Sequence, residues 1–588
     1  MVIAAGRYGH SPLCAAIVRV VSCAALLAPA PVLAQSSGAN SPGVQLQEKL
    51  RQFEASAEPK ELDIDLSNSK EDLPSTENPV SQKKMLLQEV TFKGNRKFND
   101  DFLVEFFQDL IGKEVTFADL KQSISQITTF YKSAGYITSL AYLPEQSFAS
   151  GIVEVQVVEG FIEKIEITGA NDSLRAYVKN MLASIPGGET DEIFEFSILE
   201  RQLILMRDFG GFNYKTTLSR GSRLGGSVLT VQLEKDSWSG GLTTDNNVAN
   251  QLGDLRSGVY AQYVSKTNVP IKFNVSGNYS LFDYAYTDDG LIDGIASISL
   301  PLGNKGLKAS LLWATSYTNT KDLYQGPSKV ETLGKSMYWS FGMDYPIVAR
   351  RNAQLRVGLK GTGQNSTNDI HVDDRFATNV SANKLRVARL SVDGFTYDAA
   401  STHQLSLVVS HGLSGIDDVL DPGDFPSNPY ADSSFLAGRL NLSADYRLFG
   451  GDTIFSVKGA GQLASGALPV PEQFTFGGPI FGRGFKSTHI LGDQGYSGIA
   501  QLEHNFFFKG GTSSLTPFAW IDYGSVNNLA GPLPSQRAAT YGIGLKGSAW
   551  RGKSNFEVAW GTPTLNTLDT SNVGKDYSTV YFKVGVGF

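Results

Sequence analysis

Alternation between apolar and polar side chains runs through the C-terminal part of this chain of 588 residues. From about Ser237 to the end, segments of about ten residues alternate in this way, separated by clusters of Gly, Asn, Asp and Pro. Ser434–Phe449 is the clearest case, with one parity formed by Leu436, Leu440, Leu442, Ala444, Tyr446 and Leu448. Since successive side chains of a strand point to opposite faces, each segment predicts a strand with one apolar and one polar face.

The charged residues on the polar parity favour a membrane barrel over a soluble sandwich, which would also alternate. In Ser434–Phe449 they are Arg439, Asp445 and Arg447, and they fit a water-filled lumen better than a dry core. A closed barrel also pairs every backbone N–H and C=O group, as a lipid bilayer requires. At about 22 residues per strand with its connection, residues 237–588 predict an all-β transmembrane barrel of about 16 antiparallel strands. A barrel that wide needs a plug, or it leaks.

The last segment, STVYFKVGVGF, repeats the pattern and ends on an aromatic residue. Val580, Phe582, Val584, Val586 and Phe588 share one parity. This ending resembles the terminal signature of bacterial outer-membrane barrels, which their assembly machinery reads. The resemblance implies that the barrel assembly machinery inserts the chain and that the inserted chain contacts outer-membrane lipid.

Residues 1–34 have the composition of a secretory signal peptide. Two arginines accompany an apolar run that ends at Ala34, where cleavage is expected. An uncleaved anchor helix is the alternative, and two prolines near the end of the run argue against it. Both cysteines, Cys14 and Cys23, lie in this segment, so the exported chain would have none, which suits the bacterial periplasm.

Residues 35–56 predict a short amphipathic helix, because Leu46, Leu50 and Phe53 follow i, i+4, i+7 spacing. A helix this short is marginal alone in water, so it either docks on a surface or belongs to a disordered tail. Residues 57–85 are polar, acidic and punctuated by prolines, which is the composition of a linker.

Two segments of about 75 residues, 86–160 and 161–236, then share the order strand, helix, helix, strand, strand. In the first, the second helix opens at Thr116 with Asp119 three residues on, as in a capping box. The expected elements of the first are strands at 86–95, 137–144 and 151–160 and helices at 99–110 and from 116. Those of the second are strands at 161–169, 212–221 and 226–235 and helices at 173–185 and 196–210. The segments resemble POTRA domains, the periplasmic polypeptide-transport modules, although the order alone also fits two generic α+β domains.

The stretch FTFGGPIFGRGF, residues 474–485, has a single charge among glycines and large apolar residues. It resembles the loop signature, VRG followed by Tyr or Phe, of the outer-membrane superfamily of POTRA-barrel transporters and insertases. Arg483, Gly484 and Phe485 match this signature, and Gly482 replaces its Val. The alternative is a solvent-facing arginine on a surface loop.

In that superfamily the loop folds back into the barrel, and its arginine pairs with an acid on the inner wall. Here the strand PFAWIDYG places Asp522 on the inward parity beside two aromatic residues, and Glu503 in AQLEHNFF is a second candidate. A guanidinium in a narrow channel is poorly solvated, so a bidentate pair with a carboxylate is expected.

Two such modules, a preceding helix with its linker and a large barrel together resemble the two-partner secretion transporters, the TpsB group. Insertases of the BAM type usually carry five modules, and the related translocation-assembly proteins carry three. The resemblance implies export of a large partner exoprotein, an adhesin or a haemolysin, across the bacterial outer membrane, with the modules in the periplasm. It also implies that the helix of Leu46, Leu50 and Phe53 plugs the lumen at rest.

The partner would arrive unfolded and bind the first module. We expect it to add a strand to the edge of residues 137–144 and to pack apolar side chains beside the helix that follows Thr116. The residues predicted to contact it are Phe117, Leu120, Ile124, Ile137 and Leu140.

Other functions fit less well. The enzyme motifs GxSxG and HExxH are absent, so no catalytic residue, cofactor or metal is predicted. A net charge of -7 gives no sign of nucleic-acid binding. A passive porin would not need the two modules, and an assembly factor of the insertase kind is the nearer alternative.

Overall fold

The computed structural model describes residues 41–55, 64–65, 84–169, 171–188, 191–210, 214–233, 238–247, 252, 255–281, 290–320, 330–372, 376–416, 420, 424–485, 488–508, 510–567 and 578–588. The predicted signal segment and most of the predicted linker lie outside these ranges. None of the helices within them is both long and apolar enough to span a bilayer.

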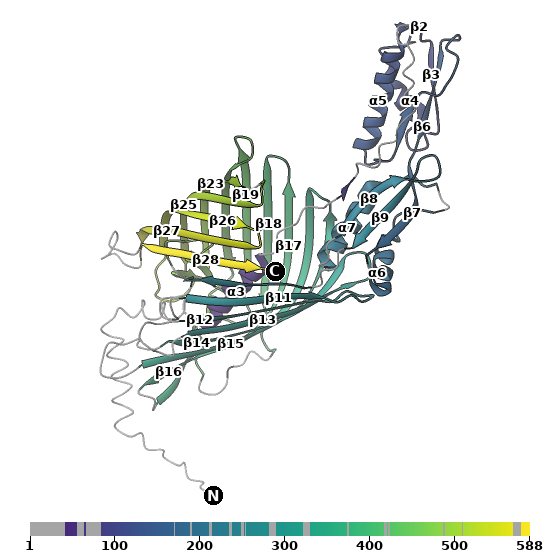
Figure 1. Ribbon diagram of the computed structural model, residues 1–588. Coiled ribbons are helices and arrows are strands. Elements are labelled where there is room, and N and C mark those ends of the chain that lie inside the picture. Colours follow the sequence, from purple (N-terminus) through teal and green to yellow (C-terminus); the bar gives the residue numbers. More distant parts are fainter. Residues whose placement is uncertain are drawn as a thin grey trace, which may run out of the picture.

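The C-terminal part is a closed antiparallel barrel (Figure 1). Its strands are β10 (Trp238–Asp245), β11 (Leu255–Val264), β12 (Lys272–Leu281), β13 (Gly290–Leu302), β14 (Leu307–Thr320), β15 (Val330–Ala349), β16 (Ala353–Val372), β17 (Phe376–Tyr397), β18 (Ser401–Gly412), β19 (Leu436–Leu448), β20 (Thr453–Ala464), β23 (Gln494–His504), β24 (Phe506–Phe508), β25 (Ser513–Asn527), β26 (Gln536–Ala549), β27 (Ser554–Asn566) and β28 (Thr579–Gly587). β23 and β24 both pair with β25 and fill one position, so the barrel has 16 strands, as predicted. Pairing of β10 with β28 closes it.

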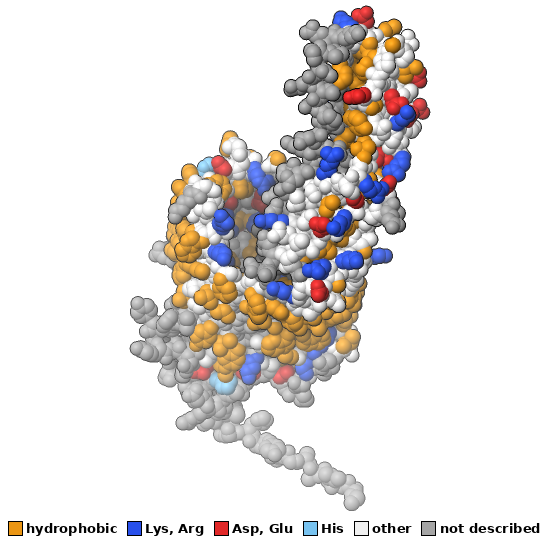
Figure 2. All heavy atoms as spheres, turned by 45° about the vertical axis from the view of Figure 1, so that its right-hand side comes forward, with side chains coloured by type: hydrophobic (Ala, Val, Ile, Leu, Met, Phe, Trp, Pro, Cys, Tyr) orange, Lys and Arg blue, Asp and Glu red, His pale blue; other side chains and the backbone are white. Residues whose placement is uncertain are grey.

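The predicted parities hold along the barrel wall. On β19 the large residues Leu436, Leu440, Leu442 and Tyr446 are exposed on the outer surface, whereas Arg439 faces inward. Figure 2 shows an apolar band across the face of the barrel that is in view. On β28, Val580, Val584 and Val586 face outward and Tyr581 is buried inside. This band matches the hydrocarbon layer of a membrane.

The first module has the predicted order with shorter elements. They are β2 (Met85–Leu86), β3 (Glu89–Lys93), α4 (Asp100–Val104), the 3₁₀ helix η3 (Glu105–Phe107), β4 (Glu114–Val115), α5 (Phe117–Ser133), β5 (Leu140–Tyr142) and β6 (Ile152–Val158). Its sheet has the order β3-β6-β5. The predicted capping box is confirmed: Asp119 N–H donates to the Thr116 hydroxyl at 3.3 Å, and Thr116 N–H donates to the Asp119 carboxylate at 2.8 Å.

The second module consists of β7 (Phe161–Thr168), α6 (Asp172–Leu182), α7 (Phe196–Gly210), β8 (Tyr214–Arg220) and β9 (Gly226–Leu233). Its sheet has the order β1-β8-β9-β7, because β1 (Ile64–Asp65), inside the predicted linker, pairs in parallel with β8. Figure 1 shows this module at one mouth of the barrel, with the first module beyond it.

Three contacts fix α7 to the barrel turns at that mouth. Arg356 donates to the carboxylate of Asp208 at 2.7 Å, and Arg201 donates to the carbonyl of Pro346 at 2.9 Å. Leu205 belongs to the core of the second module and approaches Gly306 in the turn between β13 and β14. The second module is therefore positioned directly against the barrel opening.

Candidate functional site

Helix α3 (Pro42–Ala55) lies inside the barrel (Figure 1), within the segment predicted to be amphipathic. Leu46 and Leu50 are buried and form one cluster with Ile295 and Tyr338 of the barrel wall. The backbone of Phe53 belongs to α3, but its side chain lies outside what the structure describes. The short helix thus has the docking surface that its length requires.

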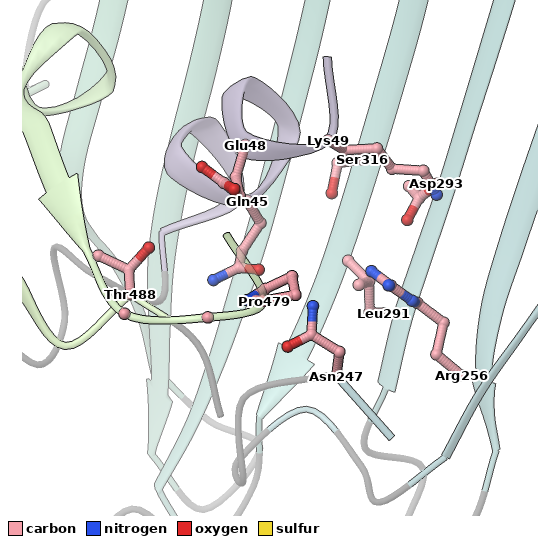
Figure 3. A pocket seen from close by; sticks show the side chains of 12 residues that line it. Gln45, Glu48, Lys49, Asn247, Arg256, Leu291, Asp293, Ser316, Pro479 and Thr488 are labelled. Atoms are coloured by element: carbon pink, nitrogen blue, oxygen red, sulfur yellow. The ribbon is translucent and has the colours of Figure 1, made fainter. Parts of the chain in front are cut away.

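Polar contacts also bind α3 to the barrel wall, and together with the apolar contacts of Leu46 and Leu50 we call them the seat of α3. The ammonium of Lys49 forms an ion pair with Asp293 of β13, where Asn278 also donates to the carboxylate at 2.8 Å. Figure 3 shows Lys49 extending from α3 toward Asp293. On the other side Gln47 donates to the side-chain carbonyl of Gln364 at 2.7 Å. These groups are paired, so their ion pair and hydrogen bonds offset the cost of removing them from water.

The connection between β20 and β23 folds into the barrel, as the resemblance implied. It contains η5 (Val470–Glu472) and the hairpin of β21 (Phe474–Phe476) and β22 (Ile490–Gly492). Phe474, Phe476 and Ile490 are buried in one cluster with Val526 of β25 and Ala538 of β26. The apolar residues of the glycine-rich stretch therefore pack against the inner wall.

Arg483 and Asp522 meet, but not through the predicted contact. One Asp522 oxygen accepts the backbone N–H groups of Gly482 at 2.9 Å and Arg483 at 3.1 Å. The other accepts the N–H and hydroxyl of Thr540 at 3.1 and 2.6 Å. The bidentate guanidinium–carboxylate geometry is therefore wrong. The carboxylate holds the loop by its backbone, and Gly482 has a φ of +81°, which glycine adopts without the steric cost that Val would meet.

The guanidinium of Arg483 points elsewhere. It donates to the carbonyl of Pro479 at 2.9 Å and to the side-chain carbonyl of Gln501 at 2.8 Å. It also lies over the rings of Trp520 and Phe518, at 5.3 and 5.7 Å from the centroids. A cation over two aromatic faces is stabilised by the ring quadrupoles.

Glu503, the second predicted acid, does not contact Arg483 directly. Its carboxylate accepts hydrogen bonds from Lys546 at 2.8 Å and from Gln501 at 2.7 Å. Because Gln501 also receives the Arg483 guanidinium, Glu503 is linked to the loop through one amide side chain.

Gly484 and Phe485 fix the tip of the loop. Gly484 N–H donates to the Thr540 hydroxyl at 3.2 Å, and its carbonyl accepts from Thr579 at 2.8 Å. A Cβ at Gly484 would lie 2.8 Å from Thr540, so no larger residue fits without a shift. Phe485 stacks on His489 with the ring centroids 3.8 Å apart.

A bidentate ion pair does hold the infolded segment, at a place that the sequence interpretation missed. Arg389 of β17 donates to both oxygens of Glu472 in η5, at 2.6 and 3.0 Å. Both side chains are largely buried, at 17% and 8% exposure. Two signals could have found it: Arg389 has the inward parity of its strand, and Glu472 lies two residues before the glycine-rich stretch.

The residues predicted to contact a partner on the first module divide into three groups. Leu120 and Ile124 are buried in its core, so the prediction that they contact a partner directly is wrong for the folded module. Ile137 packs against the core of the second module instead. Phe117 and Leu140 are half-buried and remain accessible. An apolar helical stripe here marks the core, as such stripes usually do.

The edge of β5 is partly occupied. Among the described strands β5 pairs only with β6, and its outer side faces α5. There Ala141 N–H donates to the hydroxyl of Thr128 at 2.9 Å, and that hydroxyl lies 3.4 Å from the Ala141 carbonyl. An incoming strand would have to displace this one side chain. In the described part of the chain no group of three or more His, Cys, Asp or Glu residues is arranged to hold a metal.

Comparison with known proteins agrees with this architecture. Residues 85–160 match the POTRA domain, ShlB-type, and residues 225–547 match the haemolysin secretion/activation protein ShlB/FhaC/HecB. The second match covers more than half of the chain. The chain belongs to the ShlB/FhaC/HecB family. It is an outer-membrane transporter of two-partner secretion, with its POTRA modules in the periplasm.

Relatives cover most of this family member. The outer membrane transporter CdiB of Escherichia coli is 23% identical over 467 residues, 79% of this chain and 75% of the relative. The heme/hemopexin transporter protein HuxB of Haemophilus influenzae is 22% identical over 497 residues, 82% and 83% of the two chains. The solved structure of CdiB from Escherichia coli has the same fold, with a TM-score of 0.67, 19% identity and coverage of 93% and 99%. CdiB from Acinetobacter baumannii gives a TM-score of 0.59 at 16% identity, covering 92% and 97%.

Proposed function

We propose that this transporter exports one large partner exoprotein, an adhesin or a haemolysin, and that helix α3 closes its lumen at rest. The observation that carries the proposal is the double occupation of the bore, by α3 on one wall and by the infolded hairpin on another. A passive porin needs an open bore. A transporter needs a bore that stays closed when no partner is being exported, and two obstructions would provide this.

The first module would recognise the partner while it is unfolded. A strand added to β5 would replace the hydroxyl of Thr128 by main-chain hydrogen bonds, and Phe117 and Leu140 would offer apolar contacts beside it. The second module would then deliver the polypeptide to the barrel, because α7 is fixed at the barrel mouth by Asp208 and Arg201.

Release of α3 would open the way through the lumen. The seat of α3 consists of two buried leucines, one ion pair and amide hydrogen bonds, all of them reversible contacts. The sequence contains no nucleotide-binding motif, so folding of the passenger outside the cell would make transport directional. The infolded loop, held separately by Glu472 and Asp522, would stay in place while the helix leaves.

A deletion strain tests the proposal. Loss of this transporter should remove one large polypeptide from the culture medium and cell surface, and the complemented strain should regain it. Insertion of other outer-membrane barrels should be unchanged, since an assembly factor would affect many of them. An unchanged set of secreted proteins, or a general loss of barrels, would contradict the proposal. Insertion of the transporter itself would depend on the barrel assembly machinery and outer-membrane lipid.

A further inference from the structure

A third part of the inner wall is left open by the helix and the loop. Helix α3 packs on β13 to β16, and the infolded hairpin packs on β23, β25 and β26. Between these obstructions lies a cavity of about 240 Å³ on the wall formed by β18, β19, β20, β23 and β26.

The lining is polar and carries an excess of positive charge. Four of its side chains are cations, Arg447, Lys458, Arg483 and Lys546, and two are acids, Asp445 and Glu503. A cavity with low-dielectric walls concentrates the field of its excess charge. The balance therefore favours a ligand that carries negative charge.

Two of these charges have no partner inside the described protein. Lys546 is paired with Glu503, and Arg483 is engaged with Gln501. The side chains of Asp445 and Lys458, by contrast, form no hydrogen bond or ion pair with the residues that the structure describes, and both face the lumen. An unpaired cation and an unpaired acid on adjacent strands suit a polypeptide, whose main chain and side chains offer both donors and acceptors.

A short chain of contacts links the cavity to the second module. Arg447 donates to the carbonyl of Asp398, in the turn that joins β17 to β18. The preceding residue, Tyr397, accepts a hydrogen bond from Arg351, whose backbone N–H donates to Glu200 of α7. Three residues, Asp398, Tyr397 and Arg351, thus connect Arg447 of the cavity to Glu200 of the module that would deliver the passenger.

We propose that this cavity is a docking site for an extended, acidic segment of the passenger polypeptide as it enters the barrel. Lys458 and Arg447 bind its carboxylates, and Asp445 accepts hydrogen bonds from its peptide N–H groups. Arg483 of the infolded loop also lines the site, so the loop would contact the bound polypeptide there. The inference rests on the proposed export function and assigns the wall along which export begins.

Peptide binding to the full-length transporter in detergent tests the site. The probes are two labelled flexible peptides of about 30 residues, one of Gly, Ser and Glu and the other with Lys in place of Glu, followed by fluorescence anisotropy at low salt. The acidic peptide should bind more tightly. Lys458→Gln should weaken its binding about fivefold, and Lys458→Glu more strongly. Lys583→Gln is the matched control, because Lys583 also faces the lumen but does not line the cavity.

Equal binding of the two peptides, absence of binding, or an equal effect of Lys583→Gln would overturn the site. The export assay separates this failure from that of the proposed function. If deletion of the transporter abolishes export while Lys458→Glu changes neither export nor binding, the docking site is wrong and the export function stands. If deletion removes no secreted polypeptide, the export function is wrong and the site loses its ligand. Heat-modifiable migration of each variant confirms that the barrel is folded.

Discussion

The guanidinium of Arg389 donates to both carboxylate oxygens of Glu472, and this pair joins the wall of the barrel to the base of the infolded loop. Fork-to-fork geometry fixes orientation as well as distance. The pair therefore determines where the loop enters the lumen, whereas Asp522 determines where its tip rests.

Removing one member of this pair should release the base of the loop. Glu472→Ala leaves the largely buried guanidinium of Arg389 without its carboxylate, at a cost of about 3 to 5 kcal/mol. We expect limited proteolysis to cut the loop in this variant while the barrel stays heat-modifiable. The double variant Arg389→Met with Glu472→Met is the control, because replacing both charges by apolar groups should restore much of the protection. Equal cleavage of the single and double variants would contradict the role of the pair.

Asp522 and Arg483 should give different results when they are truncated. Asp522→Ala removes the acceptor of two loop N–H groups and of Thr540, and each buried donor left unpaired costs about 1 to 3 kcal/mol. Arg483→Ala keeps the backbone contacts. Proteolysis should therefore cut the loop tip in Asp522→Ala and spare it in Arg483→Ala. The reverse order would mean that the side chain of Arg483 holds the tip.

The seat of α3 can be tested by ion conductance. Lys49→Ala leaves Asp293 buried without its cation, so the helix should leave the lumen more often and the purified protein should conduct more in planar bilayers. Combining it with Asp293→Ala should lower the conductance again. Lys583→Ala, at another lumen-facing lysine, on β28, serves as the control. A closed Lys49→Ala channel would show that the ion pair does not hold the helix.

The capping box of α5 predicts a pH dependence. The pKa of the Asp119 carboxyl is lowered because it accepts hydrogen bonds from the backbone N–H and the hydroxyl of Thr116. A carboxyl whose pKa is lower in the folded state stabilises the fold above its unfolded pKa, and this contribution is lost as pH falls through the folded pKa. The protection factors of the α5 amides, which are corrected for the intrinsic pH dependence of exchange, should fall in acid for the natural protein and depend less on pH in Asp119→Ala. Asp109→Ala, an exposed acid of the same module, should behave like the natural protein.

Much of the architecture follows from local patterns. Parity alone placed Asp522 and Glu503 on the inner wall, because a strand has a strict period of two. The capping box at Thr116 needed only a spacing of three residues. The strand number followed from length, since a bilayer of fixed thickness sets the residues used for each crossing.

The contacts that the sequence did not predict depend on tertiary placement. Arg389 and Glu472 are 83 residues apart in the sequence, so predicting their ion pair requires the position of η5 in the lumen. The geometry at Asp522 depends on the left-handed backbone of Gly482, which turns two N–H groups toward the carboxylate. The apolar helical stripe that contains Leu120 and Ile124 fits a core face as well as a partner-binding face, so the sequence alone does not decide between them.

Secretion by the Arg483→Ala variant is the decisive test of the part that the infolded loop plays in export. In this variant Asp522 still holds the loop, but the guanidinium that bridges the loop to Gln501 and lines the open cavity is gone. We expect a deletion strain complemented with Arg483→Ala to make a heat-modifiable barrel and a protease-resistant loop, yet fail to release the passenger. Normal export by this variant, at the level of the natural transporter, would show that the guanidinium has no part in export.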